Sequence, residues 1–498
     1  MKKAFTVFIA VILFVTAILS GCGSGNSSTD DKKSGGIVVE STGNDENADY
    51  TVSGKVVVAV DTARPMDYEA MFEALQNVYP NIDIEIDYFS HTTEDSAAEY
   101  LTARASTNNL PDVVFDEAGR LPLYISQGWV YPLDEFVADD PDIESVPASI
   151  IDSYRFGGKL YALPDAVTFQ TIALNNDLLD ELNLDHPETD WTFSDYEDLM
   201  KSATTAKYSG TDTLHGIEDW GAGILSTSAT LCGYNYKTRT FEMTNSFANS
   251  LKLMRELRTK TAGLEGWSLS TTSNSSGKSD YEIKFGISYS SDTKHKPFYN
   301  GLTLSMLETG TWSRRSLSEN CSFDWELWPV PQNEESLGRL PMHVDHSFMC
   351  STSSNPDAAF QVLRYITYST EGNIARLSVY DENNEGKYSL NSPYFIPATL
   401  NEKVAEKFES LPDVDEAAIY MYKNIPNSFR ADPKKIVPGW TNVDETVIRP
   451  SANTVADGKA DAMAVCSELQ GKATAAIKEY WDDFDKKLAD VQKTFDAS

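Results

Sequence analysis

Charged side chains come at the ends of two predicted strands, where they are well placed to hold a small polar ligand. Asp61 and Arg64 follow the first apolar run of the chain, and Asp116 and Arg120 follow a later one. A carboxylate can accept two hydrogen bonds from hydroxyl groups, and arginine offers a planar fork of donors. We therefore predict that these four residues contact a ligand. Each is equally typical of a solvated surface charge.

The motifs that most strongly indicate catalysis are absent from the sequence. No GxxxxGK[ST], HExxH or GxSxG occurs. The segment His343-Val344-Asp345-His346 brings two imidazoles and a carboxylate together, but it lacks the ligand spacing of known zinc motifs. We interpret its histidines as structural. The sequence thus predicts no enzyme, no metal site and no cofactor.

The elements that would position the strand-end residues alternate between strand and helix. Residues 56–60 are continuously apolar, as in a strand buried on both faces, and residues 82–88 alternate apolar with acidic side chains. Residues 68–78 carry an apolar stripe at helical spacing, and residues 96–106 form a second helical stretch. A third strand is expected at residues 111–115. This order predicts a mainly parallel α/β sheet.

Three later segments carry local signals for helices. Ser194 and Glu197 predict a capping box that opens a helix. Asn355 and Pro356 have the residue types of an N-cap and a first helical position. Near the C-terminus a short apolar stripe predicts a helix docked on the body rather than a coiled coil. The stripe consists of Ile477, Trp481, Phe484, Leu488 and Val491.

The composition excludes several classes of partner. The chain has 498 residues with 41 Lys and Arg against 75 Asp and Glu, which gives a formal net charge of −34. A nucleic-acid binder needs basic residues to neutralise phosphates, and adsorption to anionic lipid needs a basic surface. Neither is expected here. The length predicts two or three folding units rather than one core.

The N-terminal residues predict export and lipidation. Lys2 and Lys3 precede a mainly apolar run over residues 4–18, which is short for a membrane span and typical of an export signal. Leu19-Ser20-Gly21-Cys22 resembles a bacterial lipobox, in which the cysteine thiol is lipidated. We expect a signal peptide at residues 1–21 and a lipidated flexible tether at residues 22–50, rich in Gly, Ser, Asn and Asp. An uncleaved membrane anchor is the alternative.

Four cysteines remain after Cys22, and they are too few and too dispersed for a disulfide framework. Buried free thiols are the favoured interpretation, and pairing in an exported protein stays open. These cysteines are Cys232, Cys321, Cys350 and Cys466.

Ordered blocks along nearly the whole mature chain resemble a known family. The blocks are NNLPDVVF at 108–115, YISQGWVYPL at 124–133, GKLYALP at 158–164, ALNNDLL at 173–179, DWTFSDY at 190–196, and residues 302–312 with WPVP at 328–331. Behind a lipobox, this order resembles the extracellular solute-binding proteins of bacterial ABC importers, family 1, in particular the maltose-binding-protein-like carbohydrate class.

The resemblance implies an α/β fold of the two-lobe, periplasmic-binding-protein-like clamshell type, in which each lobe is a mainly parallel sheet flanked by helices. The chain would cross between lobes near Asp165, which is also a candidate for ligand contact, and again near residues 343–347. Lobe one would comprise residues 51–166 plus 345–400, and lobe two residues 167–344 plus 401–498. Ligands of open α/β sheets bind beyond the carboxyl ends of the strands, which suits a cleft between such lobes.

The resemblance also selects aromatic candidates for a sugar site, because sugars combine apolar faces with hydroxyl groups. Trp312 matches a tryptophan of the family that stacks on sugar. Trp220, with Glu218 beside it, and Trp440, in a Pro-Gly turn poorly placed for a core, occupy places of further family aromatics. Core packing is the alternative for each ring. The family often has an aromatic where Asp116 stands, which bears on the identity of the sugar.

The function expected from this resemblance is a non-catalytic receptor that captures a sugar or oligosaccharide and delivers it to an ABC permease. Its partners would be the carbohydrate and the permease subunits, and it would contact the membrane through the lipid anchor only, as an extracytoplasmic monomer. Two alternatives stay open: a receptor for another solute, such as a peptide or polyamine, and a secreted lipoprotein enzyme that acts on glycans with a carboxylate pair.

Overall fold

A computed structural model describes residues 50–62, 68–90, 95–116, 119–212, 231–260, 266–334, 337–382, 396–412 and 414–496. All of them belong to one unit, Val39–Ser498. The predicted positions Cys22, Arg64, Glu218 and Trp220 lie outside the described residues.

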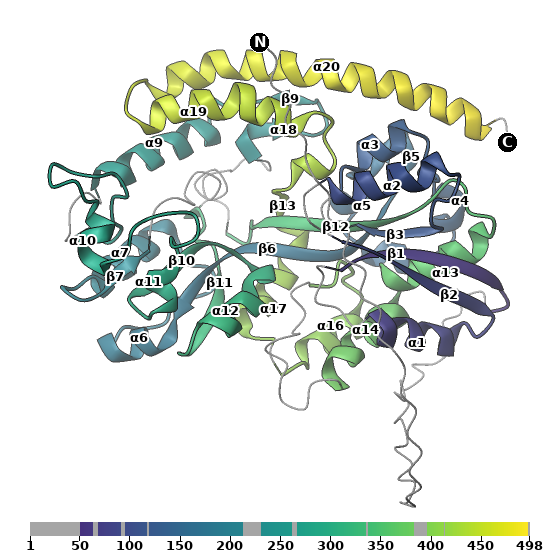
Figure 1. Cartoon of the computed structure of the whole chain (residues 1–498), viewed down its shortest axis with the longest axis horizontal. Helices are drawn as coiled ribbons and strands as arrows, with labels where there is room; N and C mark the ends of the chain where they lie inside the picture. Colours follow the sequence, from purple (N-terminus) through teal and green to yellow (C-terminus); the bar gives the residue numbers. More distant parts are fainter. Residues whose placement is uncertain are drawn as a thin grey trace, which may run out of the picture. The chain divides into compact units, whose positions relative to one another are not determined.

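The fold is α/β, and its main sheet is mixed (Figure 1). Among the described residues this sheet has nine strands, in the order β2-β1-β3-β12-β6-β10-β7, with β11 paired to β6 and β13 paired to β12. The strands are β1 (Gly54–Asp61), β2 (Ile82–Phe89), β3 (Val113–Asp116), β6 (Leu163–Asn175), β7 (Ser209–Thr211), β10 (Thr303–Gly310), β11 (Trp325–Pro329), β12 (Pro341–Met349) and β13 (Phe429–Arg430). Two small hairpins are made by β4 (Arg155–Phe156) with β5 (Lys159–Leu160), and by β8 (Tyr234–Asn235) with β9 (Thr240–Phe241).

Helices surround the sheet. They are α1 (Tyr68–Val78), α2 (Ser96–Ser106), α3 (Leu121–Ser126), α4 (Asp134–Val137), α5 (Ala148–Asp152), α6 (Asn176–Leu182), α7 (Phe193–Ala203), α9 (Ser246–Lys260), α10 (Asp280–Phe285), α11 (Lys296–Tyr299), α12 (Arg314–Asn320), α13 (Pro356–Ile366), α14 (Thr370–Glu382), α16 (Glu402–Glu409), α17 (Glu416–Lys423), α18 (Trp440–Val443), α19 (Arg449–Ala456) and α20 (Ala462–Asp496).

The first half of the sheet follows the sequence pattern. β1 lies between β2 and β3 and is parallel to both, and its residues Val56, Val58, Ala59 and Val60 are fully buried. β2 lies at the edge, so its acidic residues can face solvent while Ile82 is buried. The expected strand–helix–strand–helix–strand order is confirmed in this region.

β6 and β12 join the two halves of the sheet. Residues 163–169 of β6 pair antiparallel with β12, and residues 170–175 pair antiparallel with β10 and β11. β12 also pairs antiparallel with β3. β10 and β7 are parallel. One long strand therefore belongs to both halves, which brings residues of β6, β10 and β12 close together.

The predicted capping box is wrong by two residues. α7 begins after Thr192, whose Oγ1 accepts a hydrogen bond from the Asp195 amide at 3.3 Å, while Asp195 Oδ2 accepts from the Thr192 amide at 2.8 Å. Thr192–Asp195 and Ser194–Glu197 both have the spacing that a capping box requires, so spacing alone does not choose between them.

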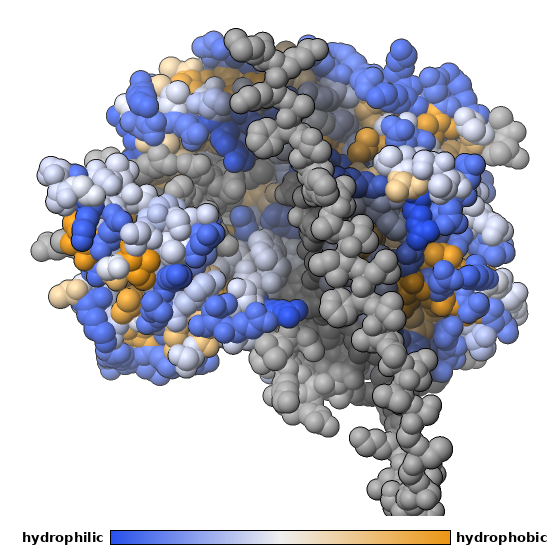
Figure 2. All heavy atoms as spheres, in the orientation of Figure 1, coloured by the Kyte–Doolittle hydropathy of each residue, from blue (hydrophilic) through white to orange (hydrophobic). Residues whose placement is uncertain are grey.

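One face of the molecule is largely polar. Hydrophilic residues dominate the face drawn in Figure 2, with hydrophobic residues scattered among them. Among the described helices, none combines the length and the apolar character that a membrane span requires.

Candidate functional site

Trp312 lies directly after β10, in a short 3-10 turn, Thr311–Ser313. Its indole folds back over Gly310 so closely that a Cβ atom built on Gly310 would collide with the six-membered part of the ring. Thr311 Oγ1 accepts a hydrogen bond from the Phe169 amide at 3.3 Å and so ties the turn to β6. The side chain of Trp312 is 40% exposed although it is large and apolar.

Beside Trp312 is a pocket of about 270 Å³, which we call the His343 pocket. The rings of Trp312 and His343 are in contact, with centroids 5.1 Å apart. Residues from β6, β12 and the segment 431–449 line the pocket, among them Gln170, His343, Lys434, Trp440, Asp444 and Arg449. The site thus forms where β6 and β12 pair and where β10 ends.

His343 is neutral at physiological pH. Burial disfavours its charged form and lowers its pKa to about 4, against the opposing effect of nearby Asp432. Its Nε2 atom is buried and has no hydrogen-bond partner among the described residues. A buried polar atom without a partner costs free energy, so this nitrogen is suited to bond a ligand group in the adjoining pocket.

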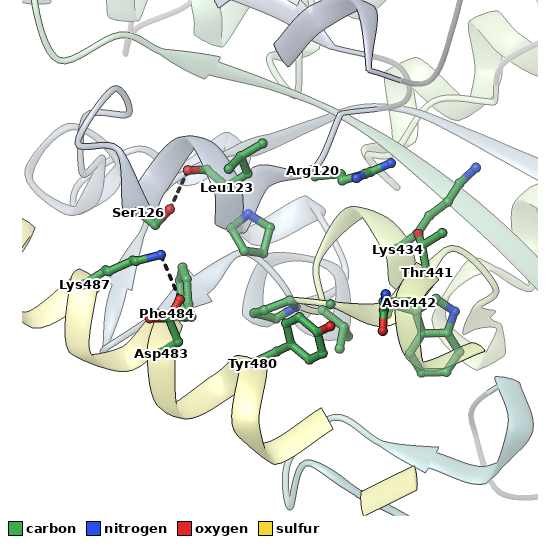
Figure 3. A pocket seen from close by; sticks show the side chains of 15 residues that line it. Arg120, Leu123, Ser126, Lys434, Thr441, Asn442, Tyr480, Asp483, Phe484 and Lys487 are labelled. Atoms are coloured by element: carbon green, nitrogen blue, oxygen red, sulfur yellow. Dashed lines mark hydrogen bonds and ion pairs between the residues drawn. The ribbon is translucent and has the colours of Figure 1, made fainter. Parts of the chain in front are cut away.

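A second pocket adjoins the first and has a volume of about 380 Å³. We call it the α20 pocket, because Tyr480, Asp483, Phe484 and Lys487 of α20 form one wall (Figure 3). Lys434, Trp440 and Thr441 line both pockets. Arg120 and residues of α3 form the opposite wall. The two pockets therefore adjoin, and both are lined by polar and aromatic residues.

A buried ionic cluster fixes the segment 430–435, which lies beside both pockets. Arg430 donates to both carboxylate oxygens of Asp432, at 2.7 and 2.9 Å. Lys435 Nζ lies 2.5 Å from Asp345 and 3.5 Å from Asp432. The four side chains are 5% exposed or less. The neighbouring cations hold the pKa of Asp432 well below its usual range against the effect of burial, which acts the other way.

Two predicted residues reach these pockets, and the structure corrects the argument for one of them. Arg120 lines the α20 pocket and forms a 3.0 Å ion pair with Asp95. Trp440 lines both pockets, but it is only 6% exposed, because its ring packs against Tyr234 and Phe241 with centroids 5.4 and 5.7 Å away. The inference that a Pro-Gly turn keeps Trp440 out of a core is therefore wrong.

Three further predicted residues, Asp61, Asp116 and Asp165, lie in strands of the main sheet. Asp61 ends β1 and is 1% exposed. Asp165, in β6, is fully buried, and its Oδ2 accepts a 2.6 Å hydrogen bond from Ser347 of β12. That bond joins the two long strands. Asp116 ends β3, opposite His346 of β12.

Sequence reasoning missed several residues of the site. Gln170, Lys434 and Tyr480 belong to no motif, and the sequence analysis interprets His343 as structural rather than as a ligand contact. Among the described residues, no group of three or more His, Cys, Asp or Glu side chains could hold a metal ion. Cys232, Cys321, Cys350 and Cys466 are free thiols, and all but Cys321 are buried.

Comparison with known proteins gives the family and confirms the fold. The family described as "Bacterial extracellular solute-binding protein" matches residues 68–381. The cyclic alpha-maltosyl-1,6-maltose binding protein from Arthrobacter globiformis is 14% identical, with a TM-score of 0.61 over 86% of this chain and 100% of that one. The GacH receptor of Streptomyces glaucescens, solved with and without acarbose, is 16% identical, with a TM-score of 0.59 over 86% and 100%.

A third solved structure is an ABC substrate-binding protein from Listeria monocytogenes in complex with cycloalternan. It is 16% identical, with a TM-score of 0.57 over 86% of this chain and 99% of that one. At these identities the likeness concerns the fold. It confirms the predicted α/β architecture of the two-lobe type.

Proposed function

Because this chain belongs to the bacterial extracellular solute-binding proteins, we propose that it captures a sugar or oligosaccharide between two hinged lobes and delivers it to the permease of an ABC transporter. The observation that carries the proposal is the indole of Trp312, which is 40% exposed beside a pocket lined by polar groups. A sugar ring can stack its apolar face on such an indole while its hydroxyl groups bond to the pocket.

The polar groups of the His343 pocket can bond to a sugar hydroxyl group whether that group donates or accepts the hydrogen bond. The Gln170 amide can donate and accept, and neutral His343 presents the buried Nε2 atom. Asp444 and Arg449, an ion pair at 2.6 Å, offer an acceptor and a donor at the far side. Solved relatives of this fold bind cycloalternan, acarbose and a maltosyl-maltose ring, which favours a carbohydrate.

We propose the lobe boundaries that the sequence predicts, with lobe one at residues 51–166 plus 345–400 and lobe two at 167–344 plus 401–498. β6 and β12 are suited to be the hinge, because they pair with each other, while β12 also pairs with β3 and β6 continues to pair with β10. Ligand contacts made from both lobes would favour the closed form, and the permease would recognise that form. Asp61, Arg64, Asp116, Arg120, Asp165, Glu218, Trp220 and Trp440 remain the further candidates for ligand contact.

We also propose that residues 1–21 are removed and that Cys22 is lipidated, so that residues 22–50 tether the protein outside the cell membrane. Membrane contact then goes through the lipid alone. The protein acts as a monomer, releases its ligand unchanged, and needs no cofactor. Its partners are the ligand and the permease subunits.

The test is a binding screen of the purified protein by calorimetry and thermal unfolding against sugars, oligosaccharides, peptides, amino acids and polyamines. We expect stoichiometric binding of one carbohydrate class and a rise in melting temperature with ligand concentration. Chromatography of the recovered sugar checks that it is unchanged. Binding of a peptide or polyamine alone would contradict the carbohydrate assignment, and cleavage of the sugar would identify an enzyme.

A further inference from the structure

α20 is the longest helix in the described part of the chain, with 35 residues and a length of about 50 Å. Its first half packs on α9 and β9, where Thr474 Oγ1 accepts a hydrogen bond from the Phe241 amide at 2.9 Å. Trp481 Nε1 donates to the Tyr234 hydroxyl at 2.8 Å. The first half and the middle of α20 are therefore fixed to the part of the chain that follows residue 231.

The last turns of α20 pack on a different part of the chain. The Phe495 ring meets Tyr131 with centroids 5.6 Å apart, and Lys159 pairs with Asp496 at 2.7 Å. α3 also contacts α20, and Figure 1 shows the helix running from the α9 side to the α3 side. In the middle of the helix, Trp481 and Phe484 pack on Phe156, with ring centroids 6.3 and 5.4 Å away. The α20 pocket lies beside this middle section, at Tyr480 and Lys487.

Tyr480, in this middle section, presents its ring to the pocket. The ring lies directly on Gly439, since a Cβ atom built there would collide with it, and Gly439 has a φ of +70° that favours glycine. Tyr480 is nevertheless 38% exposed. The backbone of the Pro438-Gly439 turn supports the ring from one side and leaves other parts of it open.

The opposite wall carries a second exposed apolar side chain. Leu123 of α3 is 40% exposed and lines the same pocket as Tyr480. Seven large hydrophobic side chains are exposed among the described residues, and these two line one pocket. Exposed apolar groups that gather in a concave, partly polar place are typical of a ligand site.

Donors and acceptors complete the pocket. Arg120, Lys434, Asn442 and Asp483 all line it, and in Figure 3 the side chains of Arg120 and Lys434 extend toward the same side. An aromatic face with hydrogen-bonding groups around it matches a sugar unit, as at Trp312. Since Lys434, Trp440 and Thr441 line both pockets, one ligand can occupy the two together.

We propose that the α20 pocket is a second sugar subsite, in which Tyr480 stacks on a further unit of the same oligosaccharide that is held at Trp312. The inference rests on the proposed function and narrows it. The ligand is an oligosaccharide that reaches both pockets, and α20 determines the preferred chain length.

The test compares affinities along series of increasing length: glucose, maltose, maltotriose, maltotetraose and maltopentaose, and the matching cello- and xylo-oligosaccharides. Calorimetry is performed on wild type, Tyr480→Ala, Tyr480→Phe and Leu123→Ala. We expect Tyr480→Ala to weaken binding of the longest ligands about tenfold and to leave the shortest ligand unchanged. Tyr480→Phe should retain most of the affinity, and Leu123→Ala should show a smaller loss with the same dependence on length.

Tyr88→Ala is the matched control, because Tyr88 is 47% exposed on β2 and lines neither pocket. It should bind every oligomer as wild type does. Thermal unfolding checks that all variants are folded. An equal loss for Tyr480→Ala at every length, or no loss at any length, overturns the second subsite while sugar binding itself stands. If no sugar of any length binds wild type, the proposed function fails, and the subsite fails with it.

Discussion

The indole of Trp312 meets the imidazole of His343 edge-on, with ring centroids 5.1 Å apart and an angle of 76° between the planes. Trp312 follows β10 directly and His343 lies in β12. These two strands do not pair with each other, but both pair with β6. An edge-to-face contact of this kind stabilises the position of the indole. The arrangement explains how a large apolar ring can be held in place and still remain 40% exposed.

Replacing Trp312 by alanine should remove the sugar platform and leave the fold intact. We expect the variant to bind its sugar about 30-fold more weakly, which corresponds to about 2 kcal/mol. The melting temperature without ligand should change little, because the ring is poorly buried. Calorimetry and thermal unfolding of the same preparation measure both quantities. A large loss of stability with unchanged affinity would place Trp312 in the core instead.

Trp440→Ala, unlike Trp312→Ala, should strongly lower the stability of the protein. Its ring is 6% exposed and packs on Tyr234 and Phe241, so its removal leaves a cavity. We expect the free energy of unfolding to fall by about 3 kcal/mol, measured by urea denaturation. Trp440→Phe, which keeps an aromatic ring, is the control and should lose less. A fully stable Trp440→Ala protein would contradict the packing role.

Asp432→Asn should destabilise the protein, since the buried cations of Arg430 and Lys435 would lose a carboxylate that both contact. We expect a loss of about 3 kcal/mol or more in the free energy of unfolding at pH 7. Asp482→Asn is the matched control, because the Lys478–Asp482 pair on α20 is well exposed, and it should lose less than about 1 kcal/mol.

The loss of stability in Asp432→Asn should also depend on pH. The cationic neighbours of Asp432 lower its pKa in the folded protein. The carboxylate therefore makes its full contribution to the free energy of unfolding at any pH above its pKa in the unfolded chain, which is about 4. This contribution is lost as the pH falls below that value toward the lowered folded pKa. The difference in stability between wild type and Asp432→Asn should therefore be constant from pH 7 to 5 and narrow below pH 4.

His343 should make the protein less stable in mild acid. Its pKa is lowered to about 4 by burial, so the unfolded chain binds a proton between pH 6.5 and 4 while the folded protein does not. The contribution of neutral His343 to the free energy of unfolding is fully present above pH 6.5, and it falls as the pH drops from 6.5 to 4. His343→Gln should have a flatter stability profile there. Asp345, Asp432, Lys434 and Lys435 carry the charges that act on this imidazole.

Gly471→Ala should stabilise the protein. Gly471 lies inside α20, and a Cβ atom built on it meets no atom within 4 Å. Alanine restricts the unfolded chain and suits a helix interior better than glycine does. We expect a gain of about 0.5–1 kcal/mol in the free energy of unfolding, measured by urea denaturation, with sugar affinity unchanged. A loss of stability would mean that α20 needs glycine here for a bend or a contact.

Local patterns predicted the elements well and the site poorly. β1, α2 and α13 lie where periodicity and end signals placed them, because these signals involve neighbouring residues only. The stripe of α20 is buried at Ile477, Trp481, Phe484 and Leu488, as predicted. Tyr480 lies outside that stripe, and nothing in its own segment indicates that Gly439 supports its ring.

Trp440 shows the same limit of local patterns, here for a residue that is buried although its own segment predicts exposure. Its Pro-Gly turn is a correct local feature, since Gly439 has a positive φ. The rings that bury Trp440 come from Tyr234 and Phe241, about 200 residues earlier in the chain. The surroundings of such a residue depend on how distant segments pack, which residue types and spacing do not encode directly.

The burial of the Arg430, Asp432, Asp345 and Lys435 cluster has a consequence for ionic strength. Salt screens exposed charges over about 8 Å at 0.15 M, whereas pairs removed from water are screened much less. The chain also carries a net charge of −34, whose self-repulsion opposes the compact state and weakens as salt rises. Added salt would therefore weaken the repulsion among the excess acidic side chains and leave the attraction inside the buried cluster nearly unchanged.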